Sequence, residues 1–342
     1  MIKIAINGFG RIGKAFLRSA YAYKDQMEVV AINDLGDVDN LAYLLKYDSV
    51  YGKAKFPVSV VEGQIIAGDW KIKMLADRDP LKLPWKDLGI DIVIESTGFF
   101  TEYAKAKAHL DAGARHVVIS APSKGVPADA GVTGAMILLG VNDNEMKGAQ
   151  ITSNASCTTN AAAPIIVILD EAIGIEKAIL NTTHAYTATQ AIVDGGAKDD
   201  WRRGRAGALN MSPSSTGAAK AVGQVYASMK GKFDGVSIRV PVPAGSIADV
   251  TFIAKRPTTV EEVNEALKKA AADPRWQRNF SVSDEQLVSS DIVGSTYGSI
   301  ADLTMTRVVD GNLVKVLAWY DNEMGYTHTL VEHALEAGKS LA

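Results

Sequence analysis

The sequence is poor in cysteine and carries little net charge. It has one Cys in 342 residues, so the chain cannot form an internal disulfide or a cluster of metal-binding thiolates. Its 36 Lys and Arg nearly balance its 39 Asp and Glu, which leaves no electrostatic argument for binding nucleic acid or a membrane surface. We therefore expect no metal site, no nucleic-acid partner and no membrane partner.

The sequence also lacks a long hydrophobic run and a targeting segment. No apolar stretch reaches the roughly 18 residues that a transmembrane helix needs. The chain begins directly with a strand pattern, without the basic segment, apolar segment and cleavage site of a secretory signal. We therefore expect a cytoplasmic protein, and 342 residues are enough for two domains that each bury a core.

The first 34 residues predict a dinucleotide-binding fold. An apolar strand at residues 2–7 leads into Gly8-Phe9-Gly10-Arg11-Ile12-Gly13, which opens a helix, and a second strand follows at 28–33. Gly8 permits the tight turn, Gly10 lets the backbone approach a pyrophosphate, and Gly13 lets helix and strand pack closely. Asp34 follows the second strand, where a carboxylate binds the adenosine ribose and repels a 2′-phosphate. NAD is the expected cofactor.

Further apolar strands are expected in the same parallel sheet. They lie at residues 91–98, 116–122 and 135–142, and a crossover helix at 102–112 joins the first two. Ligands of such a sheet bind beyond the carboxyl ends of its strands. Gly98 and Ala121 therefore mark the expected cofactor cleft.

Cys157, the only cysteine, lies in Ser153-Asn154-Ala155-Ser156-Cys157-Thr158-Thr159-Asn160, ahead of an apolar run. A lone cysteine is more often a small buried hydrophobe, but hydroxyl and amide neighbours indicate a polar setting. A thiol at a helix start feels the positive end of the helix dipole, so we expect a stabilised thiolate. Cys157 is the candidate nucleophile.

A reactive thiol needs a partner that takes a proton, and histidine has the pKa suited to that role. His184 lies in an apolar strand that turns polar and is the candidate among five histidines, although most histidines in such positions are structural. His333, in the expected C-terminal helix, is predicted to face solvent. Arg239 and the turn before Lys220 indicate anion sites.

Together these motifs resemble the phosphorylating glyceraldehyde-3-phosphate dehydrogenase family over essentially the whole chain. The resemblance is carried by residues 5–13, 153–160, 184–187 and 319–323. It implies an α/β protein with an N-terminal Rossmann-type parallel-sheet domain at 1–155, completed by a C-terminal helix at about 321–342. It also implies an α+β catalytic domain with a mixed, largely antiparallel sheet at 156–320, and a homotetramer.

The implied activity is the oxidative phosphorylation of D-glyceraldehyde 3-phosphate, with NAD and inorganic phosphate, to 1,3-bisphosphoglycerate in glycolysis or gluconeogenesis. Cys157 would be the nucleophile and His184 its base. The cofactor-binding residues would be Gly8, Gly10, Arg11, Ile12, Asp34, Arg78, Ser120, Ala121 and Asn322. The residues that hold the substrate phosphate and inorganic phosphate would be Ser156, Thr158, Thr187, Arg203, Thr216, Gly217 and Arg239.

Two alternatives and one cofactor question stay open. An erythrose-4-phosphate dehydrogenase would share the fold and nucleophile, although Thr216-Gly217-Ala218-Ala219-Lys220 follows the triose enzyme. An NAD-binding redox sensor would oxidise Cys157 without turnover, but needs neither His184 nor two phosphate sites. Gly195-Gly196 stand where many NAD-specific bacterial members have Leu-Pro, so strict exclusion of NADP is open.

Overall fold

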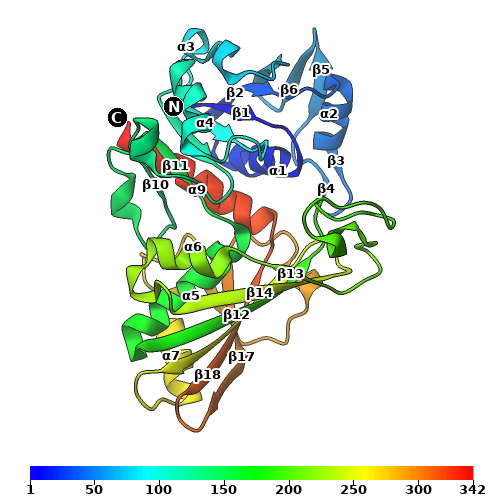
Figure 1. Ribbon diagram of the computed structural model, residues 1–342. Helices are drawn as coiled ribbons and strands as arrows, with labels where there is room; N and C mark the ends of the chain where they lie inside the picture. Colours follow the sequence, from blue (N-terminus) through cyan, green and yellow to red (C-terminus); the bar gives the residue numbers. More distant parts are fainter. Residues whose placement is uncertain (342) are drawn as a thin grey trace. The chain divides into compact units, whose positions relative to one another are not determined.

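A computed structural model describes residues 1–341, which divide into two compact units (Figure 1). Unit 1 comprises residues 1–137 and 142–155 together with the C-terminal segment from Leu330. Unit 2 comprises residues 138–141 and 156–329. Among the described residues, no helix is long and apolar enough to cross a bilayer, and no three His, Cys, Asp or Glu side chains gather where they could hold a metal ion.

Unit 1 is built on a nine-stranded sheet in the order β10-β11-β9-β8-β1-β2-β7-β6-β5. All neighbours from β10 to β7 are parallel, whereas β7, β6 and β5 pair antiparallel. The predicted Rossmann-type sheet is thereby confirmed. Its strands are β1 (Ile2–Asn7), β2 (Met27–Asn33), β5 (Val58–Val61), β6 (Gln64–Ala67), β7 (Trp70–Leu75), β8 (Ile92–Glu95), β9 (His116–Ile119), β10 (Gly134–Met136) and β11 (Ile151–Ser153).

The strand expected at residues 135–142 is much shorter than predicted. β10 ends at Met136, and the chain then turns at Gly140, where φ is +84°. The Asn142 side chain donates to the Met136 carbonyl over 2.8 Å, which closes the strand end. The apolar run therefore splits between a strand and a buried turn, because both bury their side chains and share one composition.

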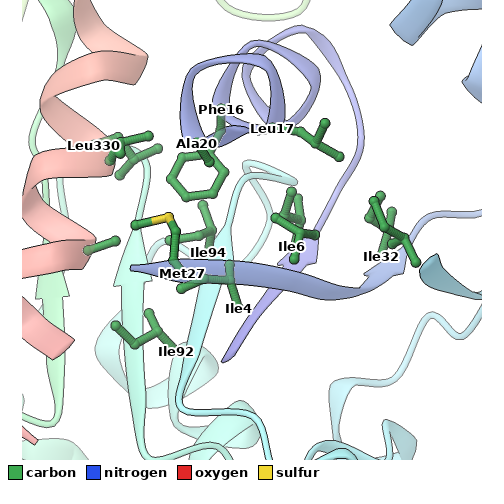
Figure 2. Packing of buried hydrophobic residues seen from close by; sticks show 14 of the residues in the cluster. Ile4, Ile6, Phe16, Leu17, Ala20, Met27, Ile32, Ile92, Ile94 and Leu330 are labelled. Carbon is green, nitrogen blue, oxygen red and sulfur yellow. The ribbon is translucent and has the colours of Figure 1, made fainter. Parts of the chain in front are cut away.

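Helices α1 (Arg11–Ala20), α2 (Val38–Lys46), α3 (Trp85–Leu88), α4 (Tyr103–Asp111) and the second half of α9 (Met324–Ser340) belong to unit 1. Apolar residues of α1 recur at helical spacing and face the sheet. Figure 2 shows Phe16 and Leu17 of α1 directed toward Ile4 and Ile6 of β1, with Leu330 of α9 in the same fully buried cluster. This packing fixes the start of α1 over the end of β1. A short hairpin, β3 (Tyr47–Asp48) and β4 (Gly52–Lys53), follows α2.

Unit 2 contains a seven-stranded mixed sheet in the order β13-β14-β12-β15-β18-β17-β16. Only β12–β14 and β16–β17 are parallel, so the predicted mixed, largely antiparallel sheet is confirmed. Helix α5 packs on this sheet and contacts α6 and α7. The strands are β12 (Ile175–Ala185), β13 (Ser212–Ser215), β14 (Phe233–Val240), β15 (Ser246–Ala254), β16 (Phe280–Ser283), β17 (Ser299–Val309) and β18 (Leu313–Tyr320), and the helices are α5 (Cys157–Ile173), α6 (Ala218–Val225), α7 (Val260–Ala271) and α8 (Ser289–Ile292).

His333 is fully buried, so its predicted exposure is wrong. Its Nε2 lies 2.7 Å from Thr152 Oγ1, which lies 2.8 Å from His116 Nε2. Burial lowers the pKa of His116 to about 4 and that of His333 to about 3, and the His116 ring further disfavours charge on His333. Helical spacing did not reveal this, because α9 is buried on more than one face.

These histidines make unit 1 acid-sensitive. Their folded pKa values lie below the ordinary value of 6.5, so the stability that the neutral rings contribute is present above pH 6.5 and is lost as pH falls toward 4 and 3. By linkage, each should cost about 2 kcal/mol of unfolding free energy between pH 7 and pH 5. His333→Asn should remove its share of this slope in urea unfolding. The partly exposed His328→Asn should keep the full slope, and equal slopes in both variants would contradict the assignment.

Candidate active site

Cys157 is the first residue of α5 and stands at the edge of a buried helix. Ser156 caps the helix, because its Oγ accepts the Thr159 backbone N–H over 3.1 Å. The helix is apolar on nearly all sides and is buried from Thr158 to Leu169, as expected of a helix inside a core. The Cys157 side chain is only partly buried. The fold thus holds the thiol rigidly at the boundary of the interior.

His184 lies near the end of β12 and faces the thiol. Its Nε2 is 3.5 Å from Cys157 Sγ, and its Nδ1 is 2.7 Å from the Ala185 carbonyl oxygen. The Arg239 guanidinium, which only donates, also lies 2.9 Å from Nδ1, so the carbonyl and the guanidinium compete for this nitrogen. The predicted partners Cys157 and His184 are in contact, and the tautomer that donates from Nδ1 to the carbonyl is the one that presents the Nε2 lone pair to the sulfur.

Arg239 lies on the other side of the imidazole. Parallel pairing of β12 and β14 places Arg239 opposite His184, and an Arg239 guanidinium nitrogen lies 2.9 Å from His184 Nδ1. The same nitrogen donates to the Ala185 carbonyl over 3.2 Å. The register of one strand pair therefore brings a permanent positive charge within reach of both reactive groups.

Burial and charge set the protonation of this pair. Burial, helped by the Arg239 charge, lowers the pKa of His184 to about 3, so the ring is neutral at pH 7 and only weakly basic. Burial also raises the pKa of the Cys157 thiol, against the opposing effects of Arg239, the Thr158 hydroxyl and the helix N–H groups. The predicted stabilised thiolate is therefore wrong for this state, because desolvation outweighs the helix dipole. The resting pair is a thiol beside a neutral imidazole.

Tyr320 is a member of this site that the sequence reasoning missed. Its hydroxyl lies 2.9 Å from Thr158 Oγ1 and 2.7 Å from Thr182 Oγ1, and its ring packs edge-on against His184 at 5.9 Å between centroids. The residue is 1% exposed. Its place at the end of a strand beside Asp321 and Asn322 was the only available signal. Tyr320 buttresses the ring of His184 and the first turn of α5.

The remaining predicted anion ligands lie on neighbouring segments of unit 2. Thr216 follows β13 and accepts from the Ala218 N–H over 3.2 Å, while Gly217 caps α6. Arg203 donates to Ser214 Oγ over 3.1 Å and lines a polar pocket of about 580 Å³. Thr187 and Thr189 share a hydroxyl contact of 2.9 Å. β13 and β14 pair directly, so Thr216 follows a strand adjacent to that of Arg239.

Unit 1 gathers most of the predicted cofactor residues at one edge of its sheet. Gly8, Asp34, Arg78 and Ser120 each follow the carboxyl end of a parallel strand, with Ala121 next to Ser120. Asn322 instead belongs to unit 2, where its Oδ1 accepts from Ser246 Oγ over 3.0 Å. Across the sheet, β2 and β7 follow on one side of β1, and β8 and β9 follow on its other side. A topological switch point therefore lies between β1 and β8.

The glycine turn has the shape that a dinucleotide requires. A Cβ on Gly8, where φ is +92°, would lie 2.7 Å from the Thr97 nitrogen, and a Cβ on Gly13 would lie 2.3 Å from the Gly8 carbonyl oxygen. A Cβ on Gly10 would meet nothing, so the start of α1 is open to a ligand there. Asp34 accepts from the Phe9 N–H over 2.7 Å, which ties the predicted ribose ligand to the turn.

Comparison with known proteins agrees with this geometry. Residues 2–103 match the family described as glyceraldehyde 3-phosphate dehydrogenase, NAD binding domain, and residues 156–322 match its C-terminal domain. The chain is 49% identical over 347 residues to a glyceraldehyde-3-phosphate dehydrogenase of Mycobacterium avium, with 99% of both chains covered. It is 47% identical over 342 residues to glyceraldehyde-3-phosphate dehydrogenase 2 of Streptomyces arenae, again with 99% of both covered.

The Arg239 charge should control the reactivity of the thiol. Arg239→Gln removes a charge that lowers the pKa of Cys157, so the pH of half-maximal alkylation by iodoacetamide should rise. The single cysteine makes the labelling unambiguous. Arg205→Gln, whose side chain pairs with Asp194 over 2.7 Å, is the matched control and should leave the profile unchanged. An unshifted profile in Arg239→Gln would refute this role.

Proposed function

The chain belongs to the glyceraldehyde-3-phosphate dehydrogenase family, and on that basis we propose that it converts D-glyceraldehyde 3-phosphate, NAD and inorganic phosphate to 1,3-bisphosphoglycerate. One observation carries the proposal most directly. The only cysteine of the chain has its Sγ 3.5 Å from Nε2 of a neutral, buried histidine. A nucleophile with a base in contact is the arrangement that covalent aldehyde oxidation needs.

NAD fits the open start of α1 and the two crowded glycines of unit 1. Gly8, Gly10, Arg11 and Ile12 would hold its pyrophosphate, and Asp34 its adenosine ribose. Arg78, Ser120 and Ala121 would bind it along the same sheet edge, and Asn322 would bind the nicotinamide carboxamide. When bound, NAD supplies the acceptor for the hydride that leaves the substrate carbon.

Cys157 and His184, which are in contact, would carry out the covalent and proton-transfer steps. His184 Nε2 takes the thiol proton while Cys157 Sγ bonds to the aldehyde carbon, and it passes that proton to the carbonyl oxygen, which becomes a hydroxyl. His184 then takes that hydroxyl proton as the carbon is oxidised, which leaves a thioester on Cys157. An oxygen of inorganic phosphate attacks the acyl carbon, the C–S bond breaks, and the acyl phosphate leaves. The sulfur ester keeps the acyl group reactive enough for this transfer.

The anion ligands complete the proposal. Arg239, Thr187 and Arg203 would bind the phosphate groups, with Arg239 serving both because it lies beside His184. Ser156, Thr158, Thr216 and Gly217 would hold the attacking phosphate with hydroxyl and backbone donors. We place this reaction in the cytoplasm, within glycolysis or gluconeogenesis, because a free nucleophilic thiol suits a reducing compartment.

A phosphate-dependent assay tests this function. The wild type should form NADH from D-glyceraldehyde 3-phosphate only with inorganic phosphate or a substitute anion, and Cys157→Ser should reduce the rate roughly 10³-fold or more while NAD still binds. Faster turnover of erythrose 4-phosphate would favour the alternative dehydrogenase, and no NADH with either aldehyde would favour a redox sensor.

NADP should be the poorer cofactor because of Asp34. Equal rates with NAD and NADP would mean that the enzyme does not exclude NADP, and we would attribute this to Gly195-Gly196.

A homotetramer is also part of the proposal, supported by exposed apolar side chains. The segment 187–211 exposes Ile192 by 87%, Trp201 by 84% and Leu209 by 80%. The sheet of unit 2 exposes Ile179 and Val236 by more than half of their surface. Clustered exposed apolar residues of this size are typical of surfaces that associate.

Sedimentation should therefore give a mass of four chains for the wild type. Ile179→Glu would bury a charge in the proposed contact and should shift the protein toward smaller species at micromolar concentration. Lys177→Glu, two residues away and already solvated, is the control. A wild type that sediments as a monomer would contradict the tetramer.

A further inference from the structure

A buried polar cluster in unit 1 lies under the switch point of the sheet. Glu95 ends β8 and Asn7 ends β1, and the two residues stand opposite each other in the parallel register. They are 2% and 1% exposed, and His109 beside them is fully buried. A carboxylate taken out of water is costly unless donors surround it. The burial of the Glu95 carboxylate at this point therefore needs an explanation.

Four donors converge on the Glu95 carboxylate. Its Oε2 accepts from Asn7 Nδ2 over 2.6 Å and contacts His109 Nε2 over 3.1 Å. Its Oε1 accepts from the Thr97 backbone N–H over 2.8 Å and from the Thr97 hydroxyl. Both oxygens are thus fully occupied as acceptors, and an uncharged amide could not satisfy the same four groups.

Trp85 decides which nitrogen of His109 carries the proton. The indole N–H of Trp85 lies 3.0 Å from His109 Nδ1, and an indole can only donate. Nδ1 is therefore the acceptor, the proton sits on Nε2, and His109 donates to Glu95. A fully buried tryptophan thereby aims the imidazole at the carboxylate.

The cluster clamps two turns that touch each other. The Ser96 hydroxyl donates to the Gly8 carbonyl over 2.7 Å, and the Thr97 nitrogen lies 2.7 Å from where a Gly8 Cβ would stand. Glu95 holds Thr97 with one oxygen and Asn7, the residue before Gly8, with the other. The carboxylate therefore sets the distance between the glycine turn and the turn after β8.

We propose that Glu95 is a positioning residue for NAD, acting through the turns at Gly8 and Thr97 that flank the switch point. The inference rests on the proposed function, because it assigns these turns to the cofactor. Asp34 follows β2 on the far side of β1, so the adenosine ribose is held away from Glu95. Glu95 therefore acts mainly on the pyrophosphate and nicotinamide half of NAD, and it reaches the adenosine ribose only through the hydrogen bond from the Phe9 N–H to Asp34.

Glu95→Gln tests this with almost no change in volume. The glutamine side chain replaces one acceptor oxygen of Glu95 with an NH2 donor, which would face another donor. The distance between the turns at Gly8 and Thr97 should therefore change. Calorimetric titration should show the Kd of NAD raised about tenfold, as expected for a hydrogen bond to a charged group. The Kd of adenosine, which lacks the phosphates that the glycine turn would hold, should stay within about twofold. A general loss of folding would weaken both ligands alike.

Asp302→Asn is the matched control. Asp302 is also a buried carboxylate, 3% exposed, and it accepts from a tryptophan, Trp319, over 3.0 Å, but it belongs to unit 2. This variant should leave the Kd of NAD and of adenosine unchanged. Thr97→Val removes the hydroxyl that donates to Glu95 and accepts from the Phe99 N–H over 3.1 Å, and it should raise the Kd of NAD about threefold and spare adenosine.

The outcomes separate the inference from the function. Selective weakening of NAD by Glu95→Gln or, if that variant does not fold, by Thr97→Val supports the positioning role. Equal weakening of NAD and adenosine, or an unchanged Kd of NAD in the folded variants, overturns it while the function stands. A wild type that binds no NAD would overturn both.

Discussion

The contact between Cys157 Sγ and His184 Nε2 depends on two backbone constraints that meet at one point. The first is the burial of α5, whose apolar sides fix its position so that its first residue stands at the boundary of the core. The second is the parallel register of β12 and β14, which sets His184 opposite Arg239. The side chains have little freedom once these backbones are in place. Reactivity here is a property of packing and register.

The same desolvation that organises the pair also tunes it. Burial keeps His184 neutral and lowers its basicity, and it also holds the thiol protonated. In the proposed reaction, proton transfer between the two is coupled to attack on the substrate. Unit 1 handles burial differently, because four hydrogen-bond donors surround the Glu95 side chain.

Local motifs were predicted well from the sequence, and long-range electrostatics was not. The Gly8 turn and both sheets were expected, because glycine conformation and strand patterns are local. His333 was expected to face solvent, yet α9 buries it. The thiolate at Cys157 was expected from the helix dipole alone, but its pKa depends on neighbours that are far away in sequence. The run 135–142 was expected as one strand, since a buried turn and a buried strand share one composition.

The sequence by itself determined the fold class, the NAD-type glycine turn, the single cysteine and the family. Each of these depends on residue type and short spacing, which the chain carries in any conformation. Only the tertiary structure decided that Arg239 lies against His184, that Tyr320 supports it, and that Glu95 is clamped by Asn7, Thr97 and His109. The physical reason is that hydrogen bonds and desolvation act across space, between residues that strand pairing and helix packing bring together.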